Sequence, residues 1–400
     1  MFRGQRLGIF GTLGLVALLV VGGILAWLGY GWYVDHQIRH LTTACEMARK
    51  SGNWSQLEQQ AAQLRMLQPS QGQPLLLLAE SAEMQGQMQK AVDLLGQFPE
   101  SDVRAPLVLA QKASLEWGKL NQPLRALKTS EDLIRLRPRT TASHGRIISF
   151  YAMTLQRPEL LAAIRRAIEM NAEPREAYAY LMMADALTFS NAIDLNSHWL
   201  SSDPSSPFFQ ITVAVMTANS LSGRVATLLT PENEEAARQA RLSVEALQRQ
   251  HPNNPILLGF LLEKCIQDGD LSRTEELLRQ VTAEHSNDHL LWSQRGWYHT
   301  LRGEFEAAET SFKTALSLHP MSWHARRNYV TLLRRQQKLG EVEKLTGLVA
   351  TALEIRVELL KLPNAREIPE ELLKRIVNYA DSCGDTLVRD ALQMRLGSRL

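Results

Sequence analysis

The stretch LLWSQRGWYHTLRGEFEAAETSFKTALSLHP, residues 290–320, indicates how the chain folds. Small and large residues recur in it at the spacing of two short helices: Trp292, Gly296, Gly303, Phe305, Ala308, Phe312, Ala315 and Pro320. A small residue in each helix lets two helices cross closely, and large residues fill the groove between them. Glycine suits the turn between the helices, and proline ends the second one. The stretch therefore predicts a helical hairpin.

This pattern resembles the tetratricopeptide repeat family, and only the tyrosine position departs from it, at His299. Three histidines, His251, His285 and His319, stand 34 residues apart, and the frame extends over most of residues 37–355. One hairpin cannot bury its apolar face alone, so the resemblance implies an all-α, right-handed α-solenoid of stacked hairpins. The resemblance gives a structural role to Gly52, Ala91, Trp292, Gly296, Gly303, Ala308, Phe312, Ala315 and Pro320.

Two polar stretches rich in helix-breaking residues interrupt the repeats. One covers residues 187–207, and the other covers residues 361–369 before two short helical segments. Residues 208–215 are β-branched and apolar, but their helical neighbours favour a buried helix. The predicted parts are a tail and anchor at 1–36, an N-terminal array at 37–186, an irregular joint with an inserted helix at 187–230, a C-terminal array at 231–360 and a helical cap at 361–400.

The N-terminal segment has the composition of a membrane anchor, because no charged residue occurs between Leu7 and Val34. The apolar run of about 24 residues would span about 36 Å as a helix, enough for a bilayer core of about 30 Å. A cleaved signal peptide is the alternative, but its apolar region is shorter and ends in small residues. The sequence therefore predicts a single uncleaved transmembrane helix over residues 7–30.

The charges that flank this segment predict its orientation. Arg3 and Arg6 precede the apolar run, whereas Asp35 follows it before the first distal arginine, which favours a cytoplasmic N-terminus. In a bacterial inner membrane, the repeats would then lie in the periplasm. Small residues at four-residue spacing, Gly4, Gly8, Gly22 and Ala26, would let two spans pack closely in a homo-oligomer. In the alternative interpretation, which we favour, glycine is simply common in membrane helices.

The composition argues against several classes of function. There are 44 Lys and Arg residues against 42 Asp and Glu residues, so no polybasic face for nucleic acid is expected. The phosphate-loop, zinc-protease, hydrolase and dinucleotide motifs are absent from the sequence, and we expect no cofactor, no metal site and no catalytic residue. His285 and His289 straddle a turn, and solvated histidines are the interpretation favoured over metal ligands. Cys45 and Cys265 are expected to be packing thiols, whereas Cys383 near the tail could be exposed, and a bridge between Cys265 and Cys383 is left open.

Repeat arrays usually bind partners on the concave face that the first helices form. The register places there Arg39, Glu46, Arg49, Glu80, Arg146, Phe150, Trp297 and Leu301. The resemblance suggests an extended or helical protein segment as the ligand, because the basic clamp that some members use for acidic C-terminal peptides is missing. Trp297 is a plausible anchor; in the alternative interpretation it only packs between repeats.

These patterns predict a membrane-anchored scaffold or adaptor for other proteins that is not an enzyme. The alternative is a permanent structural subunit of a larger membrane complex, for example an energy-transducing one. A more distant alternative is an enzyme with its site in the joint, where Asp194, His198 and Asp203 occur without a recognisable motif.

Overall fold

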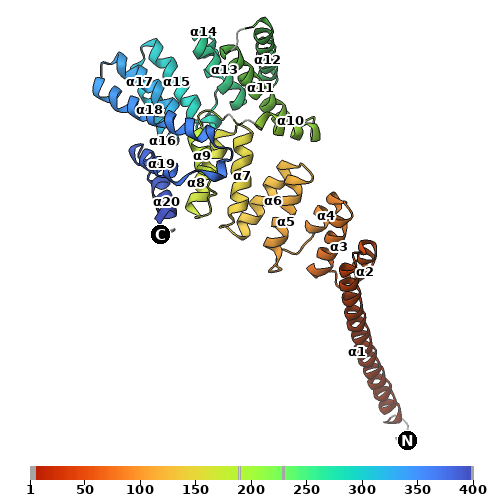
Figure 1. The fold of residues 1–400 in the computed structure, drawn as a ribbon. Helices are drawn as coiled ribbons and strands as arrows, with labels where there is room; N and C mark the ends of the chain where they lie inside the picture. The colour runs from red at the N-terminus through yellow and green to blue at the C-terminus, as the bar shows by residue number, and fades with distance from the viewer. Residues whose placement is uncertain (1–5, 188, 190, 228–229, 398–400) are drawn as a thin grey trace. The chain divides into compact units, whose positions relative to one another are not determined.

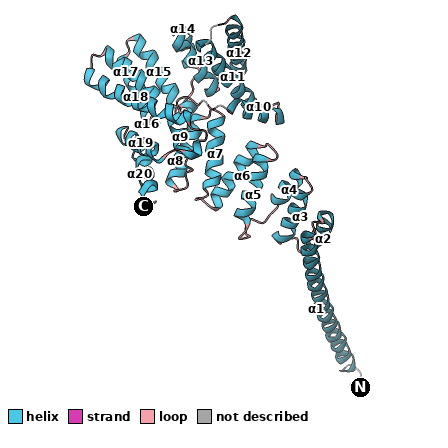
Figure 2. Cartoon of the chain, in the orientation of Figure 1, coloured by secondary structure: helices cyan, strands magenta, loops and turns pink. Residues whose placement is uncertain are grey.

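The computed structural model of this chain describes residues 6–187, 189, 191–227 and 230–397, and every regular element in these ranges is helical (Figures 1 and 2). The side chains of residues 6–20, 23, 24, 26 and 224–227 lie outside the description. The chain divides into two compact units, Met1–Leu120 and Asn121–Leu400. The all-α prediction is therefore confirmed for the described residues.

The N-terminal unit consists of successive antiparallel helices. Its elements are α1 (Arg6–Lys50), α2 (Trp54–Leu67), α3 (Gly72–Met84), α4 (Met88–Leu95) and α5 (Ala105–Gly118). Gly52 follows α1 at a φ of +69°, a conformation that glycine adopts without strain, and the side chain of Asn53 then caps α2. Small and apolar residues such as Cys45, Ala61 and Ala91 are fully buried between these helices. The spacing predicted from the repeats thus produces closely packed hairpins in this unit.

The predicted anchor is only partly covered by the described residues. Among them, no helix combines the length and hydropathy that a membrane crossing requires. Of the four residues predicted to pack between spans, Gly4 falls outside the described residues, and nothing is described around Gly8 or Ala26 at the side-chain level. Gly22 lies on α1 with no other group within 4 Å of the position of a Cβ atom.

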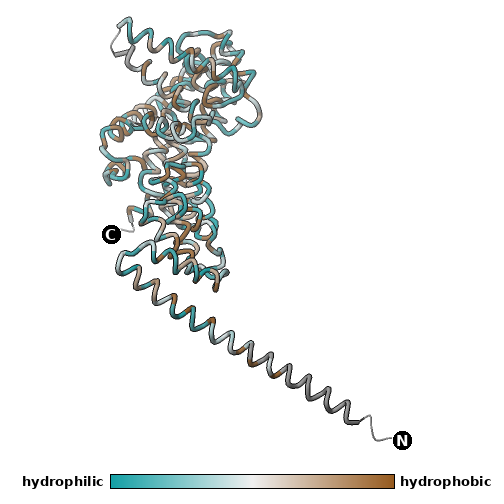
Figure 3. Tube along the Cα trace, turned by 90° about the vertical axis from the view of Figure 1, so that its right-hand side faces the viewer, coloured by the Kyte–Doolittle hydropathy of each residue, from teal (hydrophilic) through white to brown (hydrophobic). Residues whose placement is uncertain are grey.

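The C-terminal unit contains the remaining helices. They are α6 (Pro123–Leu136), α7 (Thr141–Met153), α8 (Arg157–Glu169), α9 (Ala177–Met183), α10 (Ala192–Ser202), α11 (Pro207–Thr227), α12 (Pro231–Gln250), α13 (Pro255–Asp268), α14 (Leu271–Arg279), α15 (His289–Arg302), α16 (Phe305–Leu318), α17 (Trp323–Arg335), α18 (Leu339–Lys361), α19 (Glu370–Ser382) and α20 (Thr386–Gly397), with 3₁₀ turns η1 (Ala283–His285) and η2 (Ala365–Glu367). Polar and apolar residues alternate along them, as amphipathic helices require (Figure 3).

The region predicted as an irregular joint is largely helical. Helix α10 occupies its centre, and α11 includes the stretch 208–215, whose prediction as a buried helix is confirmed. Trp199 of α10 and Phe209 of α11 are almost completely buried, with ring centroids 5.7 Å apart. Apolar burial therefore overrides the helix-breaking composition that suggested a loop here.

The last two helices pack against the middle of the chain. Helix α20 contacts α8, and the guanidinium of Arg165 on α8 donates to both carboxylate oxygens of Asp385, at 3.2 and 2.8 Å. Arg395 donates to a carboxylate oxygen of Glu173 at 3.1 Å, and the Tyr379 hydroxyl donates to the carbonyl oxygen of Met321 at 3.0 Å. The segment expected to cap the end of the array thus also covers α8.

The hairpin of α15 and α16 shows why the quoted stretch has its small residues. Ala308, Phe312 and Ala315 are completely buried, and a Cβ atom added to Gly296 would lie only 2.8 Å from the ring of Phe312. Gly303 ends α15 with a φ of +77°, in the left-handed conformation. The alanine, phenylalanine and glycine positions of the repeat therefore form one tightly packed helix crossing.

We expect Gly296→Ala to lower the free energy of unfolding by about 1–3 kcal/mol, because the new methyl group would force the buried Phe312 ring out of place. The measurement is urea unfolding followed by circular dichroism. Gly347→Ala on exposed α18 is the matched control, because no atom lies within 4 Å of its new methyl group and alanine favours a helix by about 1 kcal/mol. Equal stability of Gly296→Ala and the unmodified protein would contradict the close crossing.

Candidate functional site

A pocket of about 310 Å³ lies in the C-terminal unit between helices that are distant in the sequence. Three first helices of hairpins, α13, α15 and α17, form one side, and residues of α8, α11 and the segment after α9 form the other. Leu290, in the first turn of α15, is part of its wall. The inner side of this array is therefore partly covered by helices of the same chain. Its polar lining residues are Arg157, Asp185, Asn219, Glu263, Gln294, His324 and Arg327.

Asp185 is the centre of a buried hydrogen-bond network beside this pocket. Its Oδ1 atom accepts from Nε2 of His289 at 2.8 Å and from the Ser322 hydroxyl at 2.9 Å, and its Oδ2 atom accepts from the backbone N–H of His324 at 2.9 Å. His289 begins α15 and Ser322 caps α17, so one carboxylate joins the end of α9 to the first turns of two later helices.

The surroundings of Asp185 keep its carboxylate charged. Burial raises its pKa, but the hydrogen bond from His289 and the nearby imidazoles outweigh this effect and hold the pKa well below its ordinary value. The first turns of α15 and α17 add the positive ends of two helix dipoles. A buried charge of this kind is stable only while its donors stay in place.

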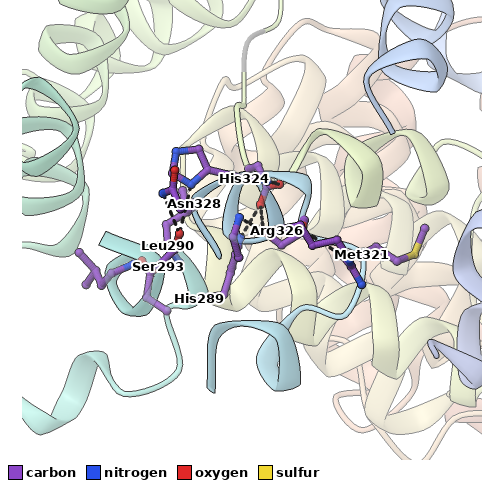
Figure 4. Close-up of polar contacts among 12 residues, drawn as sticks. His289, Leu290, Ser293, Met321, His324, Arg326 and Asn328 are labelled. Atoms are coloured by element: carbon purple, nitrogen blue, oxygen red, sulfur yellow. Dashed lines mark hydrogen bonds and ion pairs between the residues drawn. The ribbon is translucent and has the colours of Figure 1, made fainter. Parts of the chain in front are cut away.

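A second set of contacts connects this network to the wall of the pocket (Figure 4). The amide of Asn328 donates to the Ser293 hydroxyl at 3.1 Å, and that hydroxyl lies 3.4 Å from Nδ1 of His324. Nε2 of His324 lies 3.3 Å from Oε2 of Glu263. Burial raises the pKa of Glu263, but the contact with His324 prevails and lowers it to about 2. The carboxylates of Asp185 and Glu263 are thus both engaged by protein groups.

His319 completes the buried cluster. Its ring centroid lies 4.9 Å from that of His289, and burial lowers the pKa of His319 to about 3, so the side chain is neutral near pH 7. The expectation that His285 and His289 are solvated is wrong, because they are only 9% and 0% exposed, and His319 is equally buried at 1%. His289 begins α15 and His319 follows α16, so both belong to this repeat hairpin. The segment after α9, which carries Asp185 and lies outside these repeats, covers them.

The donor atoms of Asp185, His289 and His319 lie within 4.8 Å of one another. Ligands of a tetrahedral zinc ion at 2.0–2.1 Å would stand roughly 3.3 Å apart. Asp185 already accepts three hydrogen bonds, and the charges of Arg165 and Arg326 act on His319. The arrangement is therefore explained as a hydrogen-bonded network that fixes three helices, and we assign no metal to it.

The concave residues predicted for the N-terminal unit lie mainly at its surface. Nε of Arg49 on α1 donates to Oε1 of Glu80 on α3 at 2.7 Å. One turn further along α3, Glu83 accepts from the side-chain amide of Gln111 on α5 at 2.9 Å. Arg39 and Glu46 are exposed on α1. The structure thus brings three first helices together through a row of polar side chains, which we call the polar ladder (Arg49, Glu80, Glu83 and Gln111).

The predicted concave residues of the C-terminal unit lie in different surroundings. Phe150 is only 1% exposed, and its ring stacks on that of Phe208 with the ring centroids 5.9 Å apart. The prediction that Phe150 contacts a partner protein is therefore wrong. Helix α11, which the repeat register could not place, provides this cover. Arg146 donates to the Ser130 hydroxyl at 2.9 Å, and Trp297 and Leu301 are half-buried on α15.

The other residues singled out in the sequence have ordinary structural roles. Nε1 of Trp292 donates to the carbonyl oxygen of Ser286 at 2.8 Å, and Pro320 follows the last residue of α16 by two positions. Cys45, Cys265 and Cys383 are free thiols, so the bridge left open for the last two is not formed. In the joint, Asp194 and His198 are exposed.

Asp185 is the residue that sequence reasoning missed. It occurs in the plain segment Met-Ala-Asp-Ala after α9, with no motif around it. The 34-residue spacing of His285 and His319 marks equivalent positions of two repeats, but it does not show which remote carboxylate lies beside them. The sequence offered one indication of this site: Ser322, a helix-capping residue that comes two positions after Pro320.

No model of a known protein family matches this chain, and no curated protein matches it. Among solved structures, it is similar to a tetratricopeptide repeat protein from Parabacteroides merdae, with 14% identity, a TM-score of 0.28 and coverage of 74% of this chain and 99% of the other. It is also similar to the APC/C hetero-tetramer Cut9–Hcn1, with 11% identity, a TM-score of 0.33 and coverage of 88% of this chain and 80% of the other. A third similar structure is yeast Tom70, with 12% identity, a TM-score of 0.28 and coverage of 90% of this chain and 88% of the other. At these TM-scores, the repeat assignment rests on the hairpin geometry of this chain itself.

Proposed function

We propose that this chain is a non-catalytic scaffold that binds a segment of another protein along the polar ladder of its N-terminal unit. The observation that supports this most directly is that Arg49, Glu80, Glu83 and Gln111 connect first helices α1, α3 and α5 while remaining accessible to solvent. Second helices have a separate surface, on which Lys90 of α4 pairs with Glu58 of α2. The polar ladder is thus a continuous face made by one helix of each hairpin, as a solenoid binding surface requires.

The chemistry of this face suits a protein segment of mixed polarity. Its charges are those of Arg49 and of the carboxylates of Glu80 and Glu83, so both signs are present. Leu107, in the first turn of α5, is 69% exposed in the same unit. Charges of both signs fix the register of a bound segment, and an exposed apolar side chain contributes burial when the segment covers it.

We further propose that residues 7–30 hold the scaffold at a membrane, with the N-terminus in the cytoplasm and the repeats in the periplasm of a bacterium. The sequence supports this through its uncharged run between Leu7 and Val34. The exposed side chains of Leu25, Trp27 and Leu28 are consistent with an apolar environment around that part of α1. The same helix continues to Lys50, whose neighbour Arg49 is in the polar ladder.

A photocrosslinking amino acid at position 83 of the full-length chain, in its native cells, is expected to form a discrete crosslinked product with a partner protein. The same amino acid at position 90 is the matched control, because Lys90 lies on the second-helix surface of the same unit. Mass spectrometry identifies the product. Equal crosslinking at both positions, or none at position 83, would contradict the proposed binding face.

The membrane proposal has its own test. Leu18→Arg combined with Leu19→Arg, at the centre of the proposed span, is expected to move the protein from the carbonate-washed membrane pellet into the supernatant, because each arginine at a span centre costs about 2.5–3.5 kcal/mol. Leu107→Arg, at an exposed leucine of α5, should leave the protein in the pellet. Release of the unmodified protein by carbonate would contradict the anchor, while the crosslinking result would still test the scaffold.

A further inference from the structure

We infer that the pocket at Arg157 is a binding site for a small amphipathic carboxylate, a molecule with one carboxylate group and a short apolar body. This inference does not depend on the proposed scaffold, because the pocket belongs entirely to the C-terminal unit and the polar ladder to the N-terminal one. It would make the C-terminal unit sensitive to a small molecule.

The first argument is the state of the charged groups in the pocket wall. Both carboxylates are engaged: Asp185 accepts three hydrogen bonds, and Glu263 pairs with His324. In the described part of the chain, neither the guanidinium of Arg157 nor that of Arg327 has a hydrogen-bond acceptor or an ion-pair partner. Arg327 stacks on Trp323 at 5.3 Å, and its charge acts on Glu263 without forming an ion pair. The wall therefore offers unused cationic donors and no unused carboxylate, which favours an anion.

The second argument is that Arg157, at the start of α8, is partly buried and has an Nε atom without a hydrogen-bond partner. Burial lowers the pKa of Arg157, against the attraction of Asp288, Asp185 and Glu263, and its Nε atom is inaccessible to solvent without a partner. These carboxylates act on the charge without contacting it. Arg157 as a whole is half-buried and lines the pocket, so a carboxylate bound there would pair with a charge that burial disfavours and that has no ion-pair partner among the described residues.

The third argument is the apolar part of the wall together with its size. Leu155, Leu187, Val215, Ile256, Phe260 and Leu290 line the pocket. Its volume of about 310 Å³ is at the lower end of the usual range for small-molecule sites. A helix about 10–12 Å wide cannot enter such a space. The combination suits a compact carboxylate whose apolar body lies against these residues.

The test uses the full-length chain and isothermal titration with 3-phenylpropionate at neutral pH. We expect it to bind, and we expect its neutral counterpart 3-phenylpropanamide to bind at least about tenfold more weakly, because charge-assisted hydrogen bonds to the guanidinium would be lost. Inorganic phosphate should not displace 3-phenylpropionate, because it has no apolar body.

Arg157→Gln is expected to weaken 3-phenylpropionate binding at least about tenfold, and Arg249→Gln on exposed α12 should leave it unchanged. Arg327→Gln, at an exposed side chain, gives a second variant if Arg157→Gln does not fold, and it too should weaken binding. The inference is overturned if 3-phenylpropionate does not bind, if the amide binds equally well, if phosphate displaces it, or if neither pocket variant changes the affinity. None of these outcomes affects crosslinking at position 83.

Discussion

Replacement of Asp185 by alanine is expected to remove about 3–5 kcal/mol from the free energy of unfolding of the C-terminal unit. Three donors, Nε2 of His289, the Ser322 hydroxyl and the backbone N–H of His324, would lose their acceptor in the interior. Each unsatisfied buried group costs about 1–3 kcal/mol, so three such groups account for the expected loss of stability. Urea unfolding, followed by tryptophan fluorescence, measures the loss.

Two further substitutions make this result specific. Asp185→Asn keeps the size and one acceptor oxygen, but it directs an amide N–H toward a donor, so we expect a loss close to that of the alanine variant. Asp194→Ala, at an exposed aspartate of α10, should change stability by less than about 0.5 kcal/mol. A loss below about 1 kcal/mol in Asp185→Ala would show that the network does not hold the three helices together.

The second large effect is expected in acid. The pKa of His319 in the folded chain is about 3, below the ordinary value near 6.5 that it regains on unfolding. Below pH 6.5 the unfolded chain therefore binds a proton that the folded chain does not, and stability falls as the pH falls, by about 1.4 kcal/mol per pH unit until about pH 3. The groups that act on His319 are His289, Asp185, Arg165 and Arg326.

The variant His319→Gln isolates this contribution, because glutamine does not titrate. Between pH 6 and pH 4 the unmodified protein should lose about 2–3 kcal/mol more than the variant. Burial lowers the pKa of His144 in the same direction, and this contribution is the same in the two proteins. The pKa of Asp185 lies well below its ordinary value, so its carboxylate stays charged in the folded chain over this pH range. Parallel loss of stability in the two proteins would contradict the neutral, buried state of His319.

The hairpins could be predicted because their causes are local. Gly296, Ala308 and Phe312 meet within one helix pair, so a fixed spacing reports their contact. The same holds for Gly52 and Gly303, which take the left-handed conformation at turns. A repeat pattern encodes such contacts because every unit solves the same packing problem with the same residue types.

The candidate site could not be predicted, because its contacts join remote parts of the chain. Asp185 lies 104 positions from His289 and 137 from Ser322, and no periodicity relates them. Phe150 was placed on an open face because the repeat register ignores α11, which covers it with Phe208. Both cases arise where helices outside the repeat pattern fill the surface that the repeats create.

The return of α20 to α8 also determines when this unit can fold. In an open solenoid each repeat contacts its neighbours, so folding can start anywhere and spread. Here Arg165 must meet Asp385, 220 residues later, and such distant pairing slows folding because a long loop has to close first. A ribosome that makes about 5–20 residues per second would expose α8 for roughly 10–45 s before its cover emerges. During synthesis, the face of α8 that α20 covers is therefore exposed to solvent until the end of the chain has emerged.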